Sequence, residues 1–447
     1  MRPSTIAPQA LAHRLDEIEA AGADLRAMVL VERIAAFDRL AARWLQPGFA
    51  PRRRALATLP AITGYAPETI RHAIDRLWAA LSARELGRVA AGELGSGGVP
   101  ERLAFHSLAG NVPGVGLLGI VAALVAGVPS LVKTAEREPL LPLLFAESLA
   151  GVEPRLAAAL AVAHWPGGSR VHQRLAVSRA SVVLAYGRDD SIASLAAHAP
   201  PRLLRFGPHL SVAVVCRESA GPDVAAVAAR QVALFDQQGC LSPQYLVLEE
   251  GEPETTDAFL AALIESFRRL AVELPQAPLT LGEATAAWRH LEHQRWREQE
   301  GEPVRVLADR TARFSVVCDR GETLPPSPLN RHLVVLSVAD LGRARARLEQ
   351  LAGTIETIGV AAPASRRGEL AALADTCGAH RLCPLERMQA PPFAWRQSGH
   401  ARLASLLVPG SAPAAEPPSR DATPNPARRV ELARRAPASG ARPTPTP

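Results

Sequence analysis

The sequence contains almost no lysine. Of its 50 lysine and arginine residues only Lys133 is a lysine, and the 447 residues include only three asparagines, at positions 111, 330 and 425. Arginine replaces lysine on most surfaces, but not at a site fitted to a compact ammonium group. So strong a bias indicates either that the exceptions stand where no substitute works, or that they survived by chance. Lys133 and Asn111 lie in one segment, 22 residues apart, and are candidate functional residues.

Cysteine is also scarce. Five cysteines in a chain of 447 residues are too few for a disulfide framework. The first thirty residues hold four acidic side chains and no continuous apolar segment, so no secretory signal is expected. Both features predict a protein of the reducing cytoplasm.

One run of 21 residues, 112–132, carries no charge and is long enough to span a bilayer. Gly127 and Pro129 divide this run into two shorter pieces. We therefore predict a buried helix followed by a buried parallel strand, and no membrane span.

The net charge of +6 is modest and unevenly placed. Residues 409–447 hold six arginines against three acidic residues and are dominated by Pro, Ala, Ser and Arg, which predicts a disordered tail. The remaining positive charge is too small and diffuse to indicate a nucleic-acid surface. With 48% hydrophobic residues, the rest of the chain can form a sizeable core.

Hydrophobic periodicity changes near residue 100. Apolar residues recur at helical spacing in 27–44 and 69–81, so the first hundred residues are expected to be mostly helical. From residue 103 to 216, short β-rich runs alternate with Ala- and Leu-rich helical runs. This order predicts an α/β fold with a doubly wound, mostly parallel sheet. Helices near 223–235, 256–270 and 281–300, with strands near 245–248, 314–318 and 332–336, predict a second α/β region.

Three local motifs could carry chemistry. Gly114, Gly116 and Gly119 have the Gly-x-Gly-x-x-Gly spacing of the dinucleotide-binding fingerprint motif. Glycine-rich turns of this kind are also common before closely packed helices. Cys240 stands in a small polar loop between a helix and a strand, which favours an accessible nucleophile over an inert core thiol. The spacing of cysteine and histidine at 377, 380 and 383 lacks the paired ligands of a structural zinc site, so no metal is expected.

Several segments together resemble the LuxC-type acyl-CoA reductases, which make fatty aldehyde in luminous bacteria and belong to the aldehyde dehydrogenase superfamily. Residues 105–114 read FHSLAGNVPG, 131–136 read LVKTAE and 238–244 read QGCLSPQ. The ending RLCPLERMQAPPFAWR, at 381–396, is also similar. The resemblance covers about residues 100–405 and implies an aldehyde dehydrogenase-like fold.

The resemblance implies a role for each matching residue. Cys240 is the expected nucleophile, which takes the acyl group as a thioester. Asn111 and the backbone N–H of Cys240 form the expected oxyanion hole. Lys133 is expected to hold the adenosine ribose of a nicotinamide cofactor, and Ala185 and Gly187 lie at the turn beside its pyrophosphate. This assignment leaves the glycines at 114–119 to packing.

Each role has a structural alternative: Asn111 could cap the helix that begins near Gly114, Lys133 could extend from a strand end into water, and Cys240 could be a plain loop thiol.

Two departures from the superfamily pattern bear on the reaction. Arg205 stands where hydrolytic aldehyde dehydrogenases place a glutamate general base, which favours reduction of the acyl-enzyme over its hydrolysis. Glu136 resembles the acid that bonds a ribose 2′-hydroxyl and would repel a 2′-phosphate, although Arg137 could offset it; an acid at a helix N-terminus is the other interpretation. We expect NADPH, as in most LuxC-type enzymes, with NADH as the alternative.

The resemblance also implies an organisation. We predict a helical region at 1–100 packed on an NAD(P)-binding domain at 101–236, a catalytic domain at 237–380, a return segment at 381–408 and the tail at 409–447. The expected reaction reduces a fatty acyl-CoA to a long-chain aldehyde. An acyl carrier protein or an acyltransferase partner could present the acyl group instead, and a non-catalytic scaffold of the same fold is a third hypothesis. A homo-oligomer is expected.

Overall fold

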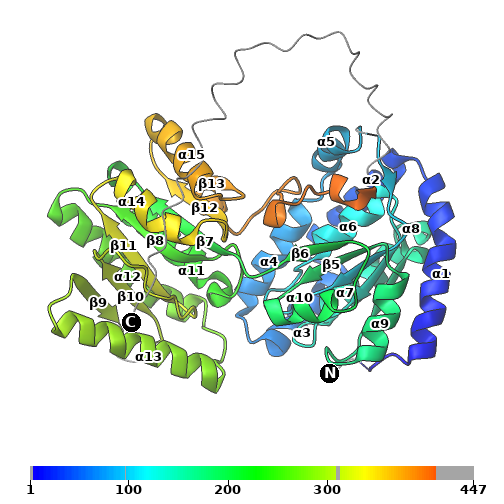
Figure 1. Cartoon of the computed structure of the whole chain (residues 1–447), viewed down its shortest axis with the longest axis horizontal. Helices are drawn as coiled ribbons and strands as arrows, with labels where there is room; N and C mark the ends of the chain where they lie inside the picture. Colours follow the sequence, from blue (N-terminus) through cyan, green and yellow to red (C-terminus); the bar gives the residue numbers. More distant parts are fainter. Residues whose placement is uncertain (1–3, 96, 309–312, 409–447) are drawn as a thin grey trace, which may run out of the picture. The chain divides into compact units, whose positions relative to one another are not determined.

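The computed structural model describes residues 4–95, 97–308 and 313–408 (Figure 1). The tail at 409–447, for which disorder is predicted, lies outside the described residues. Among the described residues no helix combines the length and apolarity needed to cross a membrane. The uncharged run at 112–132 is instead divided between a helix and a strand, as predicted.

The N-terminal region is helical, as predicted. Its helices are α1 (Pro8–Ala27), α2 (Leu30–Leu45), α3 (Ala50–Thr63), α4 (Pro67–Ala79) and α5 (Ala83–Glu93). The apolar face of α2 is buried, because its apolar residues recur every three to four positions. Trp44 at the end of α2 stacks on Trp78 of α4 with ring centroids 4.8 Å apart, which joins the two helices.

The first sheet is fully parallel, in the order β4-β3-β2-β5-β6. Its strands are β2 (Ala104–Ser107), β3 (Ser130–Lys133), β4 (Leu160–Ala163), β5 (Val182–Tyr186) and β6 (Leu203–Phe206). The helices between them are α6 (Leu117–Ala126), α7 (Leu140–Ala150), α8 (Pro154–Ala158), α9 (Arg170–Arg179) and α10 (Asp189–Ala196). The strand order reverses between β2 and β5, and in such sheets ligands bind outside the carboxyl ends of the strands at that point.

Both faces of this sheet are buried, which explains its continuous apolar runs. Phe105, Leu131 and Val183 pack in a cluster with residues of α1, α9 and α10. Their neighbours Ala104 and Val132 point the other way, into a larger cluster that includes most of α6. The sheet is therefore doubly wound, as the alternation of strands and helices predicts.

The second sheet has the order β13-β12-β7-β8-β11-β10-β9, and only β9 is antiparallel. Its strands are β7 (Leu210–Val215), β8 (Pro243–Glu249), β9 (Val304–Ala308), β10 (Ser315–Asp319), β11 (His332–Val338), β12 (Ile355–Ala361) and β13 (Leu382–Pro384). The helices α11 (Pro222–Ala233), α12 (Pro253–Glu273), α13 (Leu281–Gln299), α14 (Leu341–Leu348) and α15 (Arg367–Thr376) belong to this part of the chain (Figure 1). Both sheets together confirm the predicted α/β fold.

Strand β7 departs from the predicted organisation. The prediction places residues 101–236 in the cofactor domain, but β7 hydrogen-bonds to β8 and β12 in the seven-stranded sheet. The chain thus passes from the first sheet to the second between Phe206 and Leu210. The predicted domain boundaries otherwise stay a prediction.

The C-terminal segment returns to the N-terminal part of the chain. Strand β14 (Leu407–Val408) pairs antiparallel with β1 (Val99–Pro100). Beside this pair, Arg202 donates to Glu101 at 3.1 Å and to the carbonyl of Leu407 at 2.9 Å. These contacts tie the end of the described chain to the start of the first sheet.

Candidate active site

The loop that carries Cys240 begins with strained backbone. The short 3-10 segment Leu234–Gln237 follows α11, and its residues Phe235, Asp236 and Gln237 have φ of 58°, 50° and 61°. Non-glycine residues rarely adopt this left-handed region, and such runs persist only where surrounding contacts hold them. The loop therefore needs anchors, and these come from several parts of the chain.

The first anchor is a buried ion pair. Arg331 Nε donates to Asp236 Oδ1 at 2.6 Å, and both side chains are almost fully buried. The backbone N–H of Ala277 donates to the other oxygen of Asp236 at 3.0 Å. Burial raises the pKa of Asp236, and the charge of Arg331 opposes that shift. Removal of either partner would leave an uncompensated buried charge.

Two of the three asparagines meet on Gln238, two residues before Cys240. Asn111 Nδ2 donates to the carbonyl of Gln238 at 2.6 Å, and Gln238 Nε2 donates to Asn330 Oδ1 at 2.8 Å. Asn330 has a φ of 56°, a conformation that asparagine tolerates better than most residues. The scarcity of asparagine therefore coincides with a structural demand at both positions.

Asn111 lies beyond the carboxyl end of β2, and Cys240 precedes the amino end of β8. Tyr65 ties the two segments together, because its hydroxyl donates to the carbonyls of Asn111 at 2.7 Å and Phe235 at 3.3 Å. The interpretation of Asn111 as a helix cap is wrong: the N-cap of α6 is Gly116, and no side chain caps it.

The thiol of Cys240 is in an environment that keeps its proton. Burial, and to a smaller extent the negative charge of Glu356, raise the pKa of Cys240 to about 12. The Cys240 carbonyl accepts a 2.6 Å hydrogen bond from Ser211 Oγ at the start of β7. Ser211 pairs with Thr357 of β12, the neighbour of Glu356, so the sheet register places Glu356 near the cysteine loop.

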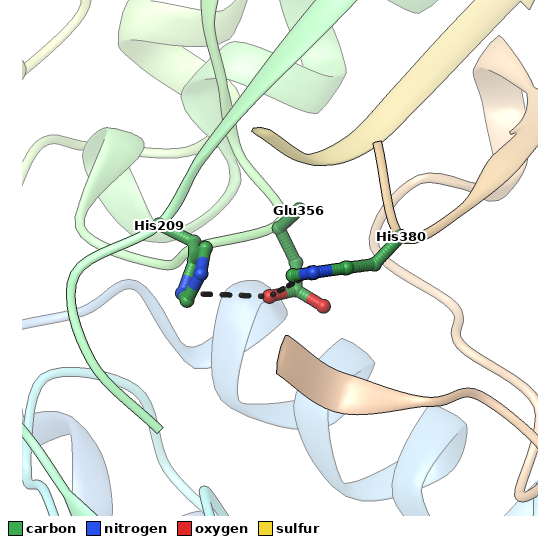
Figure 2. Close-up of side chains that lie close together, drawn as sticks. All are labelled: His209, Glu356 and His380. Atoms are coloured by element: carbon green, nitrogen blue, oxygen red, sulfur yellow. Dashed lines mark ion pairs between the residues drawn. The ribbon is translucent and has the colours of Figure 1, made fainter. Parts of the chain in front are cut away.

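Glu356 is fully buried in a cluster of polar groups. Figure 2 shows the rings of His209 and His380 directed at its carboxylate; their Nδ1 atoms lie 3.8 and 3.7 Å from Glu356 Oε2. Trp395 Nε1 and the backbone N–H of Ser398 donate to Oε1 at 3.1 and 3.0 Å. Two of these groups come from the C-terminal segment, so that segment completes the surroundings of the catalytic cysteine candidate.

The ligand atoms of His209, Glu356 and His380 all lie within 4.8 Å of one another, so this cluster could hold a metal ion. His380 thus groups with these two residues, and no metal-ligand group among the described residues joins it to Cys377 and Cys383. Cys377 instead packs in the core beside α15.

The predicted cofactor residues gather at the carboxyl edge of the first sheet. Ser107 of β2 pairs with Lys133 on one side and Ala185 on the other, so both lie at the same level of the sheet. Gly187 follows β5 with a φ of 142°, and only Ser191 lies within 4 Å of the position its Cβ would take. This open turn adjoins the point where the strand order reverses.

Lys133 is 7% exposed, and burial lowers its pKa while the charge of Glu136 opposes that shift. Its ammonium group donates one long hydrogen bond, 3.3 Å, to the carbonyl of Thr134. Within the described residues this is the hydrogen bond that the ammonium group forms, and a buried ammonium group with donors to spare fits the hydroxyl groups of a ribose. The interpretation of Lys133 as a solvent-directed side chain does not match this burial.

Glu136 is exposed, and its Oε1 accepts the backbone N–H of Gly167 at 3.1 Å. The acid at the start of α7 is Glu138, whose Oε1 accepts the N–H of Leu141 at 2.8 Å. The interpretation of Glu136 as a helix N-terminal acid is therefore wrong. Its carboxylate interacts electrostatically with Lys133.

The glycines of the fingerprint serve packing. A Cβ at Gly116 would collide with the side chain of Leu108, and one at Gly119 would collide with the hydroxyl of Tyr186. Both neighbours belong to the protein, so the missing Cβ atoms make room for the sheet rather than for a phosphate. Arg205, which the resemblance places where hydrolytic aldehyde dehydrogenases have a glutamate base, is an exposed residue of β6.

Sequence reasoning missed Glu356, His209 and Asn330, and it considered His380 only together with Cys377 and Cys383. Nothing in the residues around Glu356 distinguishes it from a surface acid, because its neighbours in space come from three distant segments. Asn330 did carry a signal, since it is one of only three asparagines.

The model of the acyl-CoA reductase (LuxC) family matches residues 25–408. The long-chain acyl-protein thioester reductase of Photorhabdus luminescens is 27% identical over 267 residues, which are 55% of this chain and 55% of that protein. The aligned part therefore spans about half the length of this curated relative.

Solved structures of aldehyde dehydrogenases share the fold. An NAD-dependent benzaldehyde dehydrogenase from Corynebacterium glutamicum superposes with a TM-score of 0.66 at 16% identity, covering 86% of this chain and 87% of that one. An NADP-dependent glyceraldehyde-3-phosphate dehydrogenase from Bacillus halodurans gives a TM-score of 0.64 at 12% identity, covering 85% and 83%. At these identities the likeness shows the fold alone.

Proposed function

The chain belongs to the acyl-CoA reductase (LuxC) family, and we propose that it reduces a fatty acyl thioester to an aldehyde through a covalent thioester on Cys240. The observation that carries the proposal is the junction at Gln238, where Asn111 from the first sheet bonds to the loop of Cys240 from the second. The relative from Photorhabdus luminescens is named a long-chain acyl-protein thioester reductase, which supports a thioester-bound acyl group as substrate.

In the first step the sulfur of Cys240 attacks the acyl carbonyl carbon, and the bond from that carbon to the carrier sulfur breaks. The proton of the Cys240 thiol ends on the departing carrier thiol. Negative charge develops on the carbonyl oxygen, and fixed donors aimed at that oxygen are the main catalytic resource. Asn111 suits this task because its amide donates without titrating, and one Nδ2 hydrogen already fixes its direction against Gln238.

A bound reduced nicotinamide supplies the hydride that converts the acyl-enzyme to an aldehyde. Cys240 then leaves as a thiolate when the carbon–sulfur bond breaks, and it takes up one proton to return to its starting state. Arg205 cannot activate water at the place where hydrolytic relatives hold a glutamate, so the acyl-enzyme is protected from hydrolysis. This supports reduction over formation of a free acid.

We assign the cofactor to the carboxyl edge of the first sheet. Lys133 holds the adenosine ribose, Ala185 and Gly187 border the pyrophosphate, and Glu136 faces the ribose hydroxyls beside the lysine. We propose NADPH as the hydride donor, with NADH as the alternative that the charge of Glu136 favours. The acyl donor proposed first is acyl-CoA; an acyl carrier protein or an acyltransferase is the second candidate, favoured by the name of the relative.

The test is a spectrophotometric assay of cofactor oxidation with palmitoyl-CoA and either NADPH or NADH. We expect the wild type to consume cofactor and Cys240→Ala to be inactive. Asn111→Ala should lower kcat by about 10²–10³-fold, because it removes one donor to the developing oxyanion. Cys216→Ala, which changes a buried cysteine outside the site, is the matched control and should keep activity.

If no cofactor is consumed, intact mass of the protein after incubation with acyl thioesters separates the remaining hypotheses. An adduct on Cys240 means that the nucleophile is right and that the carrier, chain length or hydride donor is wrong. No adduct with any carrier or chain length refutes the reductase and leaves a scaffold of the same fold. The predicted cytoplasmic location, homo-oligomer and acyltransferase partner remain predictions.

A further inference from the structure

A cavity of about 660 Å³ lies between the end of α4 and the segment 380–396. Four arginines line it, and no acidic residue does: Arg76, Arg381, Arg387 and Arg396. The remaining wall consists mostly of alanine and proline residues together with Trp395. A cavity that combines positive charge with an aromatic and proline wall fits an anionic ligand that also has a flat apolar part.

Three of these arginines are not neutralised. Arg76, Arg387 and Arg396 are exposed, and within the described part of the chain their guanidinium groups form no hydrogen bond or ion pair. Glu386, the acid adjacent in sequence, is exposed and does not line the cavity. The guanidinium forks are therefore free to bind phosphate in a bidentate manner.

Arg381 has a different role. Its guanidinium donates to the carbonyls of Met388 at 3.0 Å and Arg387 at 2.7 Å, and burial lowers its pKa. These bonds fold the segment 381–388 back on itself. The turn that carries Arg387 is thereby held against the cavity rather than left as a mobile loop.

The cavity adjoins the site of Cys240. His380 and Trp395 line it, and the same two side chains contact the carboxylate of Glu356, which lies near the cysteine. The wall of the cavity therefore borders the polar cluster around Glu356, which acts electrostatically on Cys240. Figure 2 shows His380 beside Glu356.

We propose that this cavity binds the phosphate groups of coenzyme A, so that the thioester of a free acyl-CoA reaches Cys240. The inference rests on the proposed function and specifies its carrier. Coenzyme A offers a pyrophosphate, a 3′-phosphate and a flat adenine, which match the free arginines and the aromatic and proline wall. An acyl group held on a protein cysteine carries no phosphate and would leave the arginines unused.

The test compares two thioesters with the same acyl chain: palmitoyl-CoA and S-palmitoyl-N-acetylcysteamine, which has no phosphate. Arg387→Glu and Arg396→Glu, singly and combined, should raise the KM for palmitoyl-CoA relative to the KM for the short thioester. We expect about a tenfold rise in this ratio for each variant, since a charge-assisted bond to phosphate is lost. The matched control is Arg289→Glu, an exposed arginine of α13 outside the cavity, which should keep the wild-type ratio.

Calorimetric titration with free coenzyme A makes the outcome independent of turnover. Tight binding by the wild type that weakens at least tenfold in the double variant supports the cavity, even if no thioester is reduced and the proposed function fails. If both variants turn over palmitoyl-CoA and their KM ratios stay within twofold of the wild type, the cavity is not the coenzyme A site. The proposed reductase activity would be unaffected by that result. A change in the KM for NADPH alone assigns the arginines to the cofactor and also overturns the assignment of the cavity to coenzyme A.

Discussion

At the scale of single residues, the protonation state of Cys240 determines how readily its sulfur reacts. Burial and the charge of Glu356 raise its pKa to about 12, so at neutral pH the sulfur holds its proton. A thiol reacts far more slowly than a thiolate. The resting site is therefore protected against nonspecific alkylation and oxidation, and substrate or cofactor binding must favour the loss of the proton.

This argument predicts the effect of Glu356→Gln. Loss of the negative charge removes one cause of the raised pKa, so the thiolate fraction at a fixed pH rises. We expect iodoacetamide to alkylate Cys240 about 3–10-fold faster at pH 8, which corresponds to a fall of up to one pKa unit. The rate is followed by mass spectrometry of the peptide that contains Cys240.

The matched control is Glu101→Gln, which changes a buried carboxylate paired with Arg202. It should leave the alkylation rate at Cys240 unchanged. A rate for Glu356→Gln equal to or below that of the wild type would contradict the electrostatic effect of Glu356.

The sequence pointed to Lys133, Asn111 and Cys240 because rare residues and a polar loop are visible in the text itself. In the structure Lys133 is buried at a sheet edge and Asn111 bonds to the cysteine loop, while their roles stay a prediction. Glu356 could not be found in this way. Its burial comes from His209, His380 and Trp395, which stand far from it in sequence and have ordinary local contexts.

At the scale of elements, α6 owes its position to two glycines. A Cβ on Gly119 would overlap the hydroxyl of Tyr186 on β5, so Gly119→Ala forces the helix away from the sheet. We expect the free energy of unfolding to fall by about 1–3 kcal/mol in urea denaturation. Gly87→Ala in α5 is the control, because nothing lies within 4 Å of its added Cβ.

In Gly87→Ala the higher helix propensity of alanine should raise the free energy of unfolding by up to about 1 kcal/mol. If Gly119→Ala kept wild-type stability and instead weakened cofactor binding, the fingerprint would be a phosphate loop after all. The two substitutions therefore separate packing from ligand binding.

Elements with continuous apolar runs were predictable and elements with interrupted runs were not. Four strands are predicted by the apolar runs at 103–108, 129–133, 181–186 and 203–206. Strand β6 matches its run, β2 is one residue shorter at each end, and β3 and β5 begin one residue later. Strand β12 was not predicted, because Glu356 and Thr357 interrupt its apolar pattern. Both side chains are fully buried, so tertiary contacts rather than local hydropathy determine that this segment forms a strand.

At the scale of the whole molecule, buried histidines couple folding to pH. Burial lowers the pKa of His72 to about 4, of His106 to about 3 and of His290 to about 4. In the unfolded chain these groups titrate near 6.5. Below that pH the unfolded chain binds more protons than the folded chain, so stability is full above about pH 6.5 and is lost as pH falls toward 4.

We therefore expect urea midpoints to fall steadily from pH 7 to pH 5. Each histidine contributes up to about 1.4 kcal/mol per pH unit in this range. His106→Gln should reduce this slope, whatever its effect on stability at pH 7, and His13→Gln, at an exposed position of α1, should keep it. A slope in His106→Gln as steep as in the wild type argues against the buried neutral imidazole.

The junction between the two sheets lies beyond sequence prediction. Asn111 and Gln238 are 127 residues apart, and their hydrogen bond depends on how the carboxyl edge of one sheet meets the amino edge of the other. Nothing in the local sequence of either segment indicates that the two segments are in contact. The resemblance to a known family supplied this pairing, since hydrophobic periodicity fixes elements but not the contacts between their ends.

The single lysine has a practical consequence. Apart from the amino terminus, Lys133 carries the only aliphatic amine of the chain. It is 7% exposed and has a lowered pKa at the carboxyl edge of the first sheet. Amine-directed acylating reagents thus have one internal target, and burial restricts their access to it. If the proposed nucleotide binds beside Lys133, it should shield this one amine from the reagent, with which the arginines elsewhere do not react.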